Sequence, residues 1–362
     1  MIAGGGTAGH IVPALAIGRA IHAIAPDTRL VCVGAERPID HIMFEREALP
    51  VHYLPRVALP RGVRLAWLTF PFRFLRILSR ARYIVRRERP DVVVSTGGYV
   101  GGIITIAARL ARVPVVQQEQ NAVAGKSARL ASRWAARIYN VSRGDGVITI
   151  APDSIRGPFP VGNPVLAAVS GPVDSTGKER DLLLVTGGSQ GALGLNRPVA
   201  DMLLATDASR EPVYWQCGQT QFDELRARID AALRHNVTLV SFSAEMPERL
   251  THARLAIGRS GALSLEEFAR AGTPSILVPL PSAAQNEQRA NARSAAAHGS
   301  AVVVEQAQLT GARLARITRA LLSAPGVLAD MQHAAYRNRS IGAAWSIAED
   351  TLSLISSPNA TR

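Results

Sequence analysis

The chain has 362 residues, a formal net charge of +13 and a hydrophobic content of 47%. This length suits two domains, and this composition excludes a mainly disordered chain. No apolar run reaches the roughly 18 residues of a membrane span, and no charged-then-apolar leader is visible. Cys32 and Cys217 lie far apart in apolar segments, which favours buried free thiols in a reduced, cytoplasmic protein over a disulfide or metal site.

Positive charge is concentrated in the first half of the chain. Residues 1–160 contain 22 Lys and Arg against 10 Asp and Glu, a net charge of +12, whereas residues 161–362 carry a net charge of +1. We therefore expect the first half to face an anionic partner.

Short segments rich in Val, Ile and Leu alternate with longer amphipathic stretches, which indicates an α/β fold with buried parallel strands. One strand–helix series starts at residue 2 and a second near residue 181. The Pro-, Gly- and Ser-rich segment 156–181 between them is a plausible linker. We predict a first domain at 1–163, a second at 164–340, and a closing helix within 341–362 that could pack back on the first domain.

The first glycine-rich turn, GGGTAGH, occupies residues 4–10 between a short apolar segment and a helical pattern. Glycines allow close backbone approach to a ligand, and free amides at a helix N-terminus suit phosphate. His10 begins this helix and, with an unperturbed pKa of about 6.5, is a candidate general base. A tight turn without a ligand and a solvent-facing histidine are the alternatives.

Two further loops of the first half follow predicted strands. STGGYVGG (95–102) carries Gly97, Gly98 and Tyr99, and its paired glycines again suggest close approach or simply a tight turn. QQEQNAVAG (117–125) places Glu119 and Asn121 at a strand end, where open α/β sheets bind ligands. Glu119 is the competing candidate for the base.

The second half repeats this plan. TGGSQGALGLN (186–196) offers backbone amides and the Ser189 hydroxyl, and GRSGALSLEEFARAG (258–272) is again a strand, a turn and a helix. Glu266 and Glu267 could accept hydrogen bonds from ribose hydroxyls or form a solvated helix face. Gln288 could bind sugar hydroxyls. No cluster of His, Cys and Asp has metal-ligand spacing, so we expect no metal and no required cofactor.

Residues 56–89 contain ten arginines and one acidic residue, interleaved with aromatic and aliphatic side chains. Such a pattern suits an anionic bilayer surface, and no recognised nucleic-acid-binding module accompanies it, so we expect no nucleic-acid partner. Part of the apolar set must belong to the core. The residues predicted to contact the membrane are Arg64, Trp67, Phe70, Arg73, Phe74, Arg76 and Leu78.

Seven motifs in this order resemble those of one family, the bacterial undecaprenyldiphospho-muramoylpentapeptide β-N-acetylglucosaminyltransferases of peptidoglycan synthesis. The motifs, which span residue 2 to about 310, are GGGTAGH, STGGYVGG, QEQNAVAG, VGNPV, GGSQGALGLN, RSGALSLEE and QRANA. The resemblance implies a GT-B fold, in which two Rossmann-like parallel-sheet domains face each other across a cleft.

The resemblance also implies an activity. Such enzymes transfer GlcNAc from UDP-GlcNAc to the muramoyl 4-hydroxyl of lipid I, the undecaprenyl-diphosphate-linked muramoyl-pentapeptide, making lipid II with inversion and without a metal for donor binding. The C-terminal domain is expected to bind UDP-GlcNAc. The N-terminal domain is expected to bind lipid I at the cytoplasmic face of the cell membrane, as a peripheral protein.

Site residues carry over by motif, with His10 as the base. The resemblance assigns binding of the acceptor diphosphate to the loops that contain Gly5, Gly6, Gly97, Gly98 and Tyr99. The resemblance assigns binding of the UDP-GlcNAc donor to Thr7, Ala8, Gly9, Asn121, Ser189, Ser243, Ala262, Leu263, Ser264, Leu265, Glu266, Glu267 and Gln288. The chain departs from the family pattern at Leu166, where Arg is usual, at Gln118, where His often stands, and at Gln285, where an acid is usual.

Two other functions fit parts of the pattern. A UDP-GlcNAc 2-epimerase shares the architecture but does not need a basic, aromatic surface, and in a non-catalytic membrane-surface protein the glycine loops would only be turns. The first strand is also unusual, because three residues precede the glycines and a typical strand has about five or six. We expect a shortened first strand and a start codon a few residues upstream.

Overall fold

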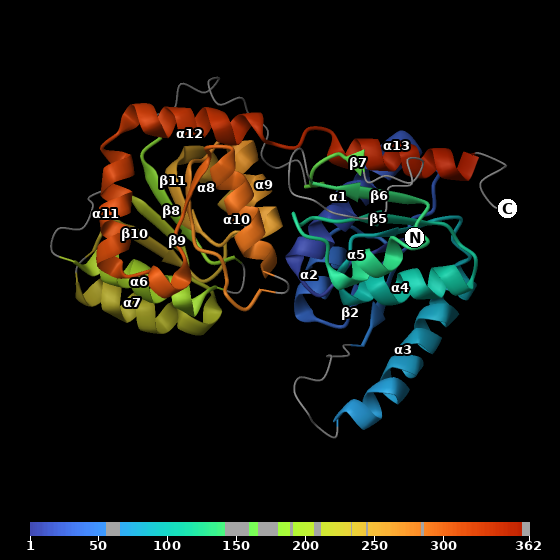
Figure 1. The fold of residues 1–362 in the computed structure, drawn as a ribbon. Coiled ribbons are helices and arrows are strands. Elements are labelled where there is room, and N and C mark those ends of the chain that lie inside the picture. Colours follow the sequence, from blue (N-terminus) through green and yellow to red (C-terminus); the bar gives the residue numbers. More distant parts are fainter. Residues whose placement is uncertain are drawn as a thin grey trace. The chain divides into compact units, whose positions relative to one another are not determined.

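The computed structural model describes residues 1–55, 66–141, 159–165, 180–188, 191–205, 211–232, 234–243, 245–283 and 286–356, without the side chains of 66–68 and 160. The chain forms two compact units (Figure 1). Unit 1 comprises Met1–Leu166 and Ile341–Arg362, and unit 2 comprises Ala167–Ser340. Within the described ranges, no helix combines the length and the apolar character needed to cross a membrane.

Unit 1 is built on a seven-stranded parallel sheet in the order β3-β2-β1-β4-β5-β6-β7. The strands are β1 (Ile2–Ala3), β2 (Cys32–Ala35), β3 (Val51–Leu54), β4 (Val93–Ser95), β5 (Val115–Gln118), β6 (Arg137–Asn140) and β7 (Phe159–Pro160). The helices are α1 (Ala8–Ile24), α2 (Pro38–Glu45), α3 (Ala66–Glu88), α4 (Gly98–Leu110), α5 (Lys126–Ala131) and α13 (Ala343–Ser356).

Strand order reverses between β1 and β4, which pair in parallel through Ile2 and Val94. Ligands of open α/β sheets bind beside the carboxyl ends of the strands at such a reversal. The helices α1 and α4 begin at these two strand ends, so the sheet brings the first two glycine loops together.

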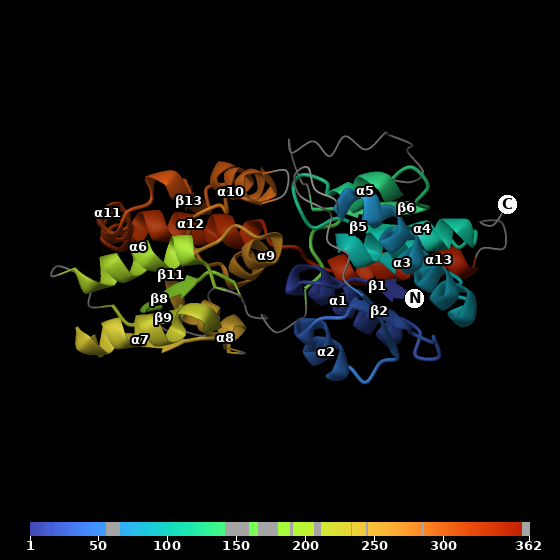
Figure 2. The same cartoon turned by 90° about the horizontal axis from the view of Figure 1, so that it is seen from below.

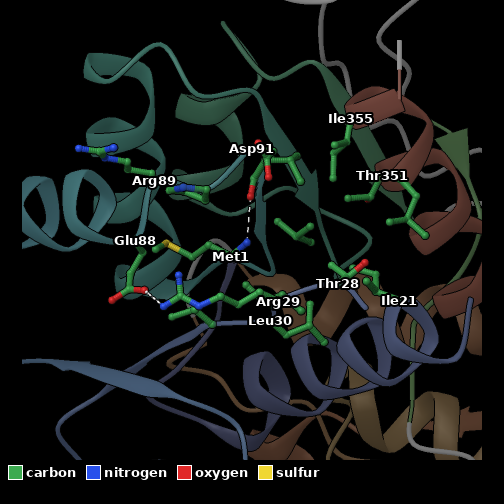
Figure 3. A pocket seen from close by; sticks show the side chains of 16 residues that line it. Met1, Ile21, Thr28, Arg29, Leu30, Glu88, Arg89, Asp91, Thr351 and Ile355 are labelled. Carbon is green, nitrogen blue, oxygen red and sulfur yellow. Dashed lines mark hydrogen bonds and ion pairs between the residues drawn. The ribbon is translucent and has the colours of Figure 1, made fainter. Parts of the chain in front are cut away.

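The first strand is short, as the sequence predicts, because β1 contains only Ile2–Ala3. The Met1 amine donates a hydrogen bond to the Val92 carbonyl at 3.0 Å inside a pocket at the amino end of the sheet (Figure 3). Burial lowers the pKa of this amine to about 6. In the same pocket, Arg29 forms an ion pair with Glu88 at 2.5 Å.

The closing helix α13 packs on α1 in unit 1. Its Ile347 and Ala348 are fully buried in one cluster with Ile17 and Val94. Asp350 on the same helix accepts hydrogen bonds from Arg137 Nε at 3.0 Å and from the Tyr139 hydroxyl. Burial, followed by the Asp350 carboxylate, raises the pKa of Tyr139.

Unit 2 has a six-stranded parallel sheet in the order β10-β9-β8-β11-β12-β13. The strands are β8 (Leu182–Thr186), β9 (Val213–Gln216), β10 (Val237–Val240), β11 (Ala253–Gly258), β12 (Ser275–Leu277) and β13 (Ala301–Val303). The helices are α6 (Leu193–Leu204), α7 (Phe222–Ala231), α8 (Met246–His252), α9 (Ala262–Ala271), α10 (Glu287–Ala297), α11 (Gly311–Leu322) and α12 (Pro325–Arg337).

Helices cover both faces of each sheet (Figures 1 and 2). The fully buried Trp215 of β9 lies in the main core cluster of unit 2, with apolar side chains from α6 and α7. The predicted α/β fold with two Rossmann-like parallel-sheet units is therefore confirmed.

Candidate active site

His10 and Thr96 join the two glycine loops of unit 1. His10 Nδ1 donates to the Thr96 carbonyl oxygen at 2.8 Å, and Thr96 Oγ1 donates to the His10 carbonyl oxygen at 2.7 Å. Because a carbonyl oxygen only accepts, Nδ1 carries the proton, and Nε2 of the neutral ring keeps a lone pair. In this tautomer Nε2 is the nitrogen that can accept a proton.

Glycine at positions 97 and 98 makes room for this ring. A Cβ on Gly98 would lie 2.9 Å from His10 Cδ2, and one on Gly97 would lie 3.4 Å from Nδ1. Both residues also have positive φ angles, +89° and +69°, which disfavour other residues. The first glycine pair of STGGYVGG is thus explained by the position of His10.

Glu119 has a different environment from His10. Its buried carboxylate accepts from the Gln120 and Asn121 amides, both at 2.9 Å, from Asn121 Nδ2 at 3.0 Å and from the Gly125 amide at 2.8 Å. Both oxygens are used to shape the loop after β5, and Asn121 is held in the same network. The geometry favours His10 as the base and gives Glu119 a structural role.

Free amides remain at the starts of α1 and α4. Within the part of the chain that the structure describes, the amides of Ala8, Gly9 and Gly98 make no hydrogen bond. Thr7 is the exposed N-cap of α1, and its side chain caps no amide. Two adjacent helix N-termini with free amides favour an anionic ligand.

Other members of the predicted diphosphate loops already have hydrogen-bond partners within the chain. The Gly6 amide donates to Asp40 at 2.9 Å, and the Gly97 amide donates to Ser95 Oγ at 3.3 Å. Neither amide is therefore available to a diphosphate. The Tyr99 hydroxyl donates to the Leu54 carbonyl at 3.3 Å, and Gly5 is buried against Asp40.

The glycine loop after β8 needs its glycines for backbone reasons. Gly188 and Gly191 have φ angles of +83° and +72°, and a Cβ on Gly191 would lie 2.0 Å from the Cys217 carbonyl oxygen. Ser189 lies outside the described residues. The strand β11 lies next to β8 in the sheet, and α9 begins directly after the loop that follows β11. The first turn of α9 contains the half-buried Ala262, Leu263, Ser264 and Leu265.

The structure separates the two adjacent glutamates of α9. Glu266 is buried and accepts from the Ser340 amide at 2.8 Å, from Ser340 Oγ at 2.6 Å and from Arg270 Nε at 3.2 Å. The fold thus already uses the carboxylate that was predicted to contact the donor. Glu267 is half-buried, and its carboxylate makes no hydrogen bond within the described residues; burial, followed by the Glu266 charge, raises its pKa to about 7.

Ser243 and Gln288 are each partly committed. The Ser243 amide donates to Gln216 Oε1 at 2.9 Å. The carbonyl oxygen of Ser243 is therefore the backbone group that remains to bind the base of a nucleotide-sugar donor. Gln288 Oε1 accepts from the Leu280 amide at 3.0 Å. The NH₂ group of Gln288 is therefore the part that suits a sugar hydroxyl.

Sequence reasoning missed Arg259, which is buried at the end of β11. Its guanidinium donates to the Val278 carbonyl at 3.0 Å and to Gln306 Oε1 at 2.7 Å, while Nε has no partner and no carboxylate pairs with the group among the described residues. Burial lowers the pKa of Arg259 to about 10, so it stays cationic at neutral pH. A single Arg in a glycine turn does not by itself predict such burial.

The predicted membrane surface maps partly onto α3. Arg73 and Arg76 are exposed, whereas the half-buried Phe74 and Leu78 pack against the core of unit 1. The exposed apolar side chains are instead Phe72, Leu75 and Tyr83, at 75%, 60% and 62%. Phe70 is half-buried, its ring 6.1 Å from that of Phe74. Arg64 and the Trp67 side chain lie outside the described residues.

Comparison with known proteins defines the class. Residues 1–140 match the glycosyltransferase family 28 N-terminal domain, and residues 182–345 match the glycosyltransferase family 28 C-terminal domain. The chain therefore belongs to glycosyltransferase family 28, and it is a glycosyltransferase enzyme.

Individual relatives share one name, UDP-N-acetylglucosamine–N-acetylmuramyl-(pentapeptide) pyrophosphoryl-undecaprenol N-acetylglucosamine transferase. One from Alkalilimnicola ehrlichii is 39% identical and covers 92% of this chain and 93% of its own length. Another from Symbiobacterium thermophilum is 34% identical, with coverages of 92% and 90%. The crystal structure of Acinetobacter baumannii MurG is similar with a TM-score of 0.73 at 27% identity over 98% of both chains.

A more distant structure shares the fold alone. A putative UDP-N-acetylglucosamine 2-epimerase from Listeria monocytogenes has a TM-score of 0.62 at 16% identity, covering 95% of this chain and 93% of its own. This likeness reflects the common two-unit architecture, and fold does not determine function.

Proposed function

We propose that this chain transfers GlcNAc from UDP-GlcNAc to the muramoyl 4-hydroxyl of lipid I, making lipid II. The name shared by the relatives supports both substrates. The observation that carries the chemistry is the orientation of His10, whose Nδ1 is fixed by Thr96 so that Nε2 is the basic atom, beside the free amides of α1 and α4.

The reaction needs one base and stabilisation of one leaving group. The acceptor 4-hydroxyl attacks the anomeric carbon in line, the bond from that carbon to the UDP phosphate oxygen breaks, and His10 Nε2 takes the hydroxyl proton. General-base catalysis of this kind typically contributes about 10²–10⁴-fold. The imidazolium then returns its proton to solvent. In-line displacement inverts the anomeric configuration.

Donor binding is assigned to unit 2. Glu267 is the carboxylate suited to the ribose hydroxyls, and the Gln288 NH₂ group suits a GlcNAc hydroxyl. The buried Arg259 cation, together with the loop amides, would stabilise the diphosphate of departing UDP, since preorganised donors act strongly in a site of low dielectric. In this assignment the protein's own groups carry that charge, with no metal or cofactor.

Lipid I binding is assigned to unit 1. The free amides of Ala8 and Gly9, which the resemblance gave to the donor, and of Gly98 suit the diphosphate of lipid I instead. The surplus of positive charge also lies in this half of the sequence. Figure 1 shows the first turns of α3 projecting beyond the sheet of unit 1, while the end of the helix lies beside α4. The exposed Phe72 and Leu75, flanked by Arg73 and Arg76, suit the surface of an anionic membrane.

The test is incubation of the purified chain with UDP-GlcNAc and lipid I in detergent, separately and together. We expect a lipid product heavier by one GlcNAc, with UDP released only when both substrates are present. Conversion of UDP-GlcNAc to a 2-epimer without acceptor would support an epimerase instead. Failure to bind or consume UDP-GlcNAc would point to a non-catalytic protein.

A further inference from the structure

Arg37 and Asp40 hold both polar groups of Gly6. The carboxylate of Asp40, which is fully buried, accepts from the Gly6 amide at 2.9 Å and from the Ala35 amide at 2.7 Å. Arg37 Nη1 donates to the Gly6 carbonyl oxygen. Arg37 is the N-cap of α2 and Asp40 lies in its first turn, so the start of one helix fixes both the amide and the carbonyl of Gly6.

We call the contacts that Arg37 and Asp40 make with Gly6 the Gly6 clamp. The surrounding glycines leave space for these contacts. A Cβ on Gly5 would lie 2.5 Å from Asp40 Oδ1, and one on Gly34 would lie 3.2 Å from the same atom and 2.8 Å from Phe44 Cε2. Gly6 itself has a φ of +90°. Glycines 5, 6 and 34 therefore leave room for a buried carboxylate and a left-handed turn.

The charges of the clamp do not suit simple attraction of an anion. Asp40 is a carboxylate close to helix amides that suit a phosphate, where its charge opposes anion binding. Burial raises its pKa, while the Ala35 and Gly6 amides and the nearby Arg37 charge act in the opposite direction. Arg37 forms no ion pair among the described residues. The arrangement is best explained as one that fixes the backbone of Gly6.

We infer that Arg37 and Asp40 are positioning residues for the acceptor diphosphate. By fixing both ends of Gly6, they set the direction in which the first turn of α1 presents the Ala8 and Gly9 amides and the His10 ring. The inference rests on the proposed function, because it concerns the lipid-linked diphosphate that unit 1 would bind. It extends that function with two residues outside the glycine motifs.

The first test removes the Arg37 contact, which is half-buried and not essential to the core. Arg37→Met is expected to lower kcat/KM for lipid I by about 10–100-fold, since small misplacements at a site are costly, while KM for UDP-GlcNAc stays within about twofold. Arg37→Lys, which keeps one donor, should recover most of the loss. Arg46→Met removes the same charge from the exposed end of the same helix and should change neither constant.

The second test separates positioning from electrostatics. Asp40→Asn removes a negative charge beside the anion site, so a purely electrostatic role predicts a lower KM for lipid I. Positioning predicts a higher KM and a lower kcat, because an NH₂ group in the place of Oδ2 would face the Gly6 amide, which is itself a donor and lies 3.1 Å from that oxygen. UDP binding and the thermal unfolding midpoint are measured for each variant, so that misfolding is recognised.

The outcomes are distinct from those of the proposed function. If the unsubstituted chain makes no lipid II, the proposed function fails. If the unsubstituted chain is active and Arg37→Met retains its lipid I kinetics, or Asp40→Asn binds lipid I more tightly, the inference is overturned. Loss confined to lipid I kinetics in both variants, with recovery in Arg37→Lys, supports it.

Discussion

The imidazole of His10 is oriented by Thr96, and Thr96 is in turn held by the backbone of His10. The two hydrogen bonds, at 2.8 and 2.7 Å, cross from the loop after β1 to the loop after β4. The Thr96 carbonyl also accepts from Gln120 Nε2 at 2.6 Å. The contact that joins the loops therefore also selects the basic nitrogen of the ring.

Replacement of His10 tests its role as base. His10→Gln should lower kcat by about 10²–10⁴-fold, the usual contribution of a general base, with UDP affinity unchanged because donor binding is assigned to unit 2. Steady-state kinetics and calorimetric titration with UDP measure the two effects. Near-normal turnover in His10→Gln would reverse the assignment.

Replacement of Glu119 should act on stability. Glu119→Ala leaves the Gln120, Asn121 and Gly125 amides without their acceptor, and each unsatisfied buried donor costs about 1–3 kcal/mol. We expect a lower unfolding free energy in urea. If Glu119→Ala is fully stable but inactive while His10→Gln is active, Glu119 is the base.

Donor affinity should depend on pH through Glu267. Its pKa is raised to about 7 by burial and by Glu266, and only its ionised form accepts hydrogen bonds from two ribose hydroxyls. UDP-GlcNAc affinity should therefore rise between about pH 6 and 8, with proton release into the buffer. Glu267→Gln should weaken binding and remove this dependence. Proton uptake on binding would contradict the assignment.

The same group has a calculable effect on folding. Folding raises the pKa of Glu267 from 4.5 to about 7. The folded state therefore binds more protons than the unfolded state between about pH 4.5 and 7. The contribution of Glu267 to the unfolding free energy is thus fully present below this range and is lost as the pH rises through it. Glu267→Gln should flatten this part of the stability profile.

The attachment of α13 to unit 1 can be tested at Asp350. Asp350→Ala removes the bonds to Arg137 and Tyr139, at an expected cost of about 1–3 kcal/mol. Hydrogen exchange should show faster opening of α13. Glu349→Ala is the matched control, because Glu349 accepts a hydrogen bond from the exposed Trp345 on the same helix. Equal effects of both substitutions would argue against a specific role for Asp350.

Membrane docking is predicted to depend on the exposed apolar residues of α3. Phe72→Ser and Leu75→Ser should each weaken binding to vesicles containing anionic lipid by about tenfold, as expected for loss of an apolar contact. Val327→Ser, at an exposed position in unit 2, is the control. Vesicle sedimentation measures binding. Unchanged binding in both α3 variants would place the membrane contact elsewhere.

The sequence was sufficient for the fold because periodicity and glycine turns are local signals. The two strand–helix series predicted to start at residue 2 and near residue 181 correspond to the sheets of units 1 and 2, whose first strands are β1 and β8. The ordered motifs identified the family, and His10 emerged because it begins a helix after a glycine loop. These features depend on neighbouring residues and are visible in a single chain.

Partners of buried polar groups were not predictable in this way. Glu266 and Glu267 are adjacent and chemically alike, yet the turn of α9 directs one to Ser340 and leaves the other without a bond in the described part of the chain. Asp40 belongs to no recognisable motif, because its partner Gly6 lies 34 residues away in the sequence and only the fold brings the two together. Such contacts arise from tertiary packing and carry no sequence period.

The most direct measurement for the central claim is the structure of the product formed from UDP-GlcNAc and lipid I, determined by NMR alongside quantification of UDP. We expect one UDP per product and a β-linked GlcNAc on the muramoyl 4-oxygen, formed far more slowly by His10→Gln. An α-linkage, transfer to another hydroxyl, or consumption of UDP-GlcNAc without lipid I would contradict it.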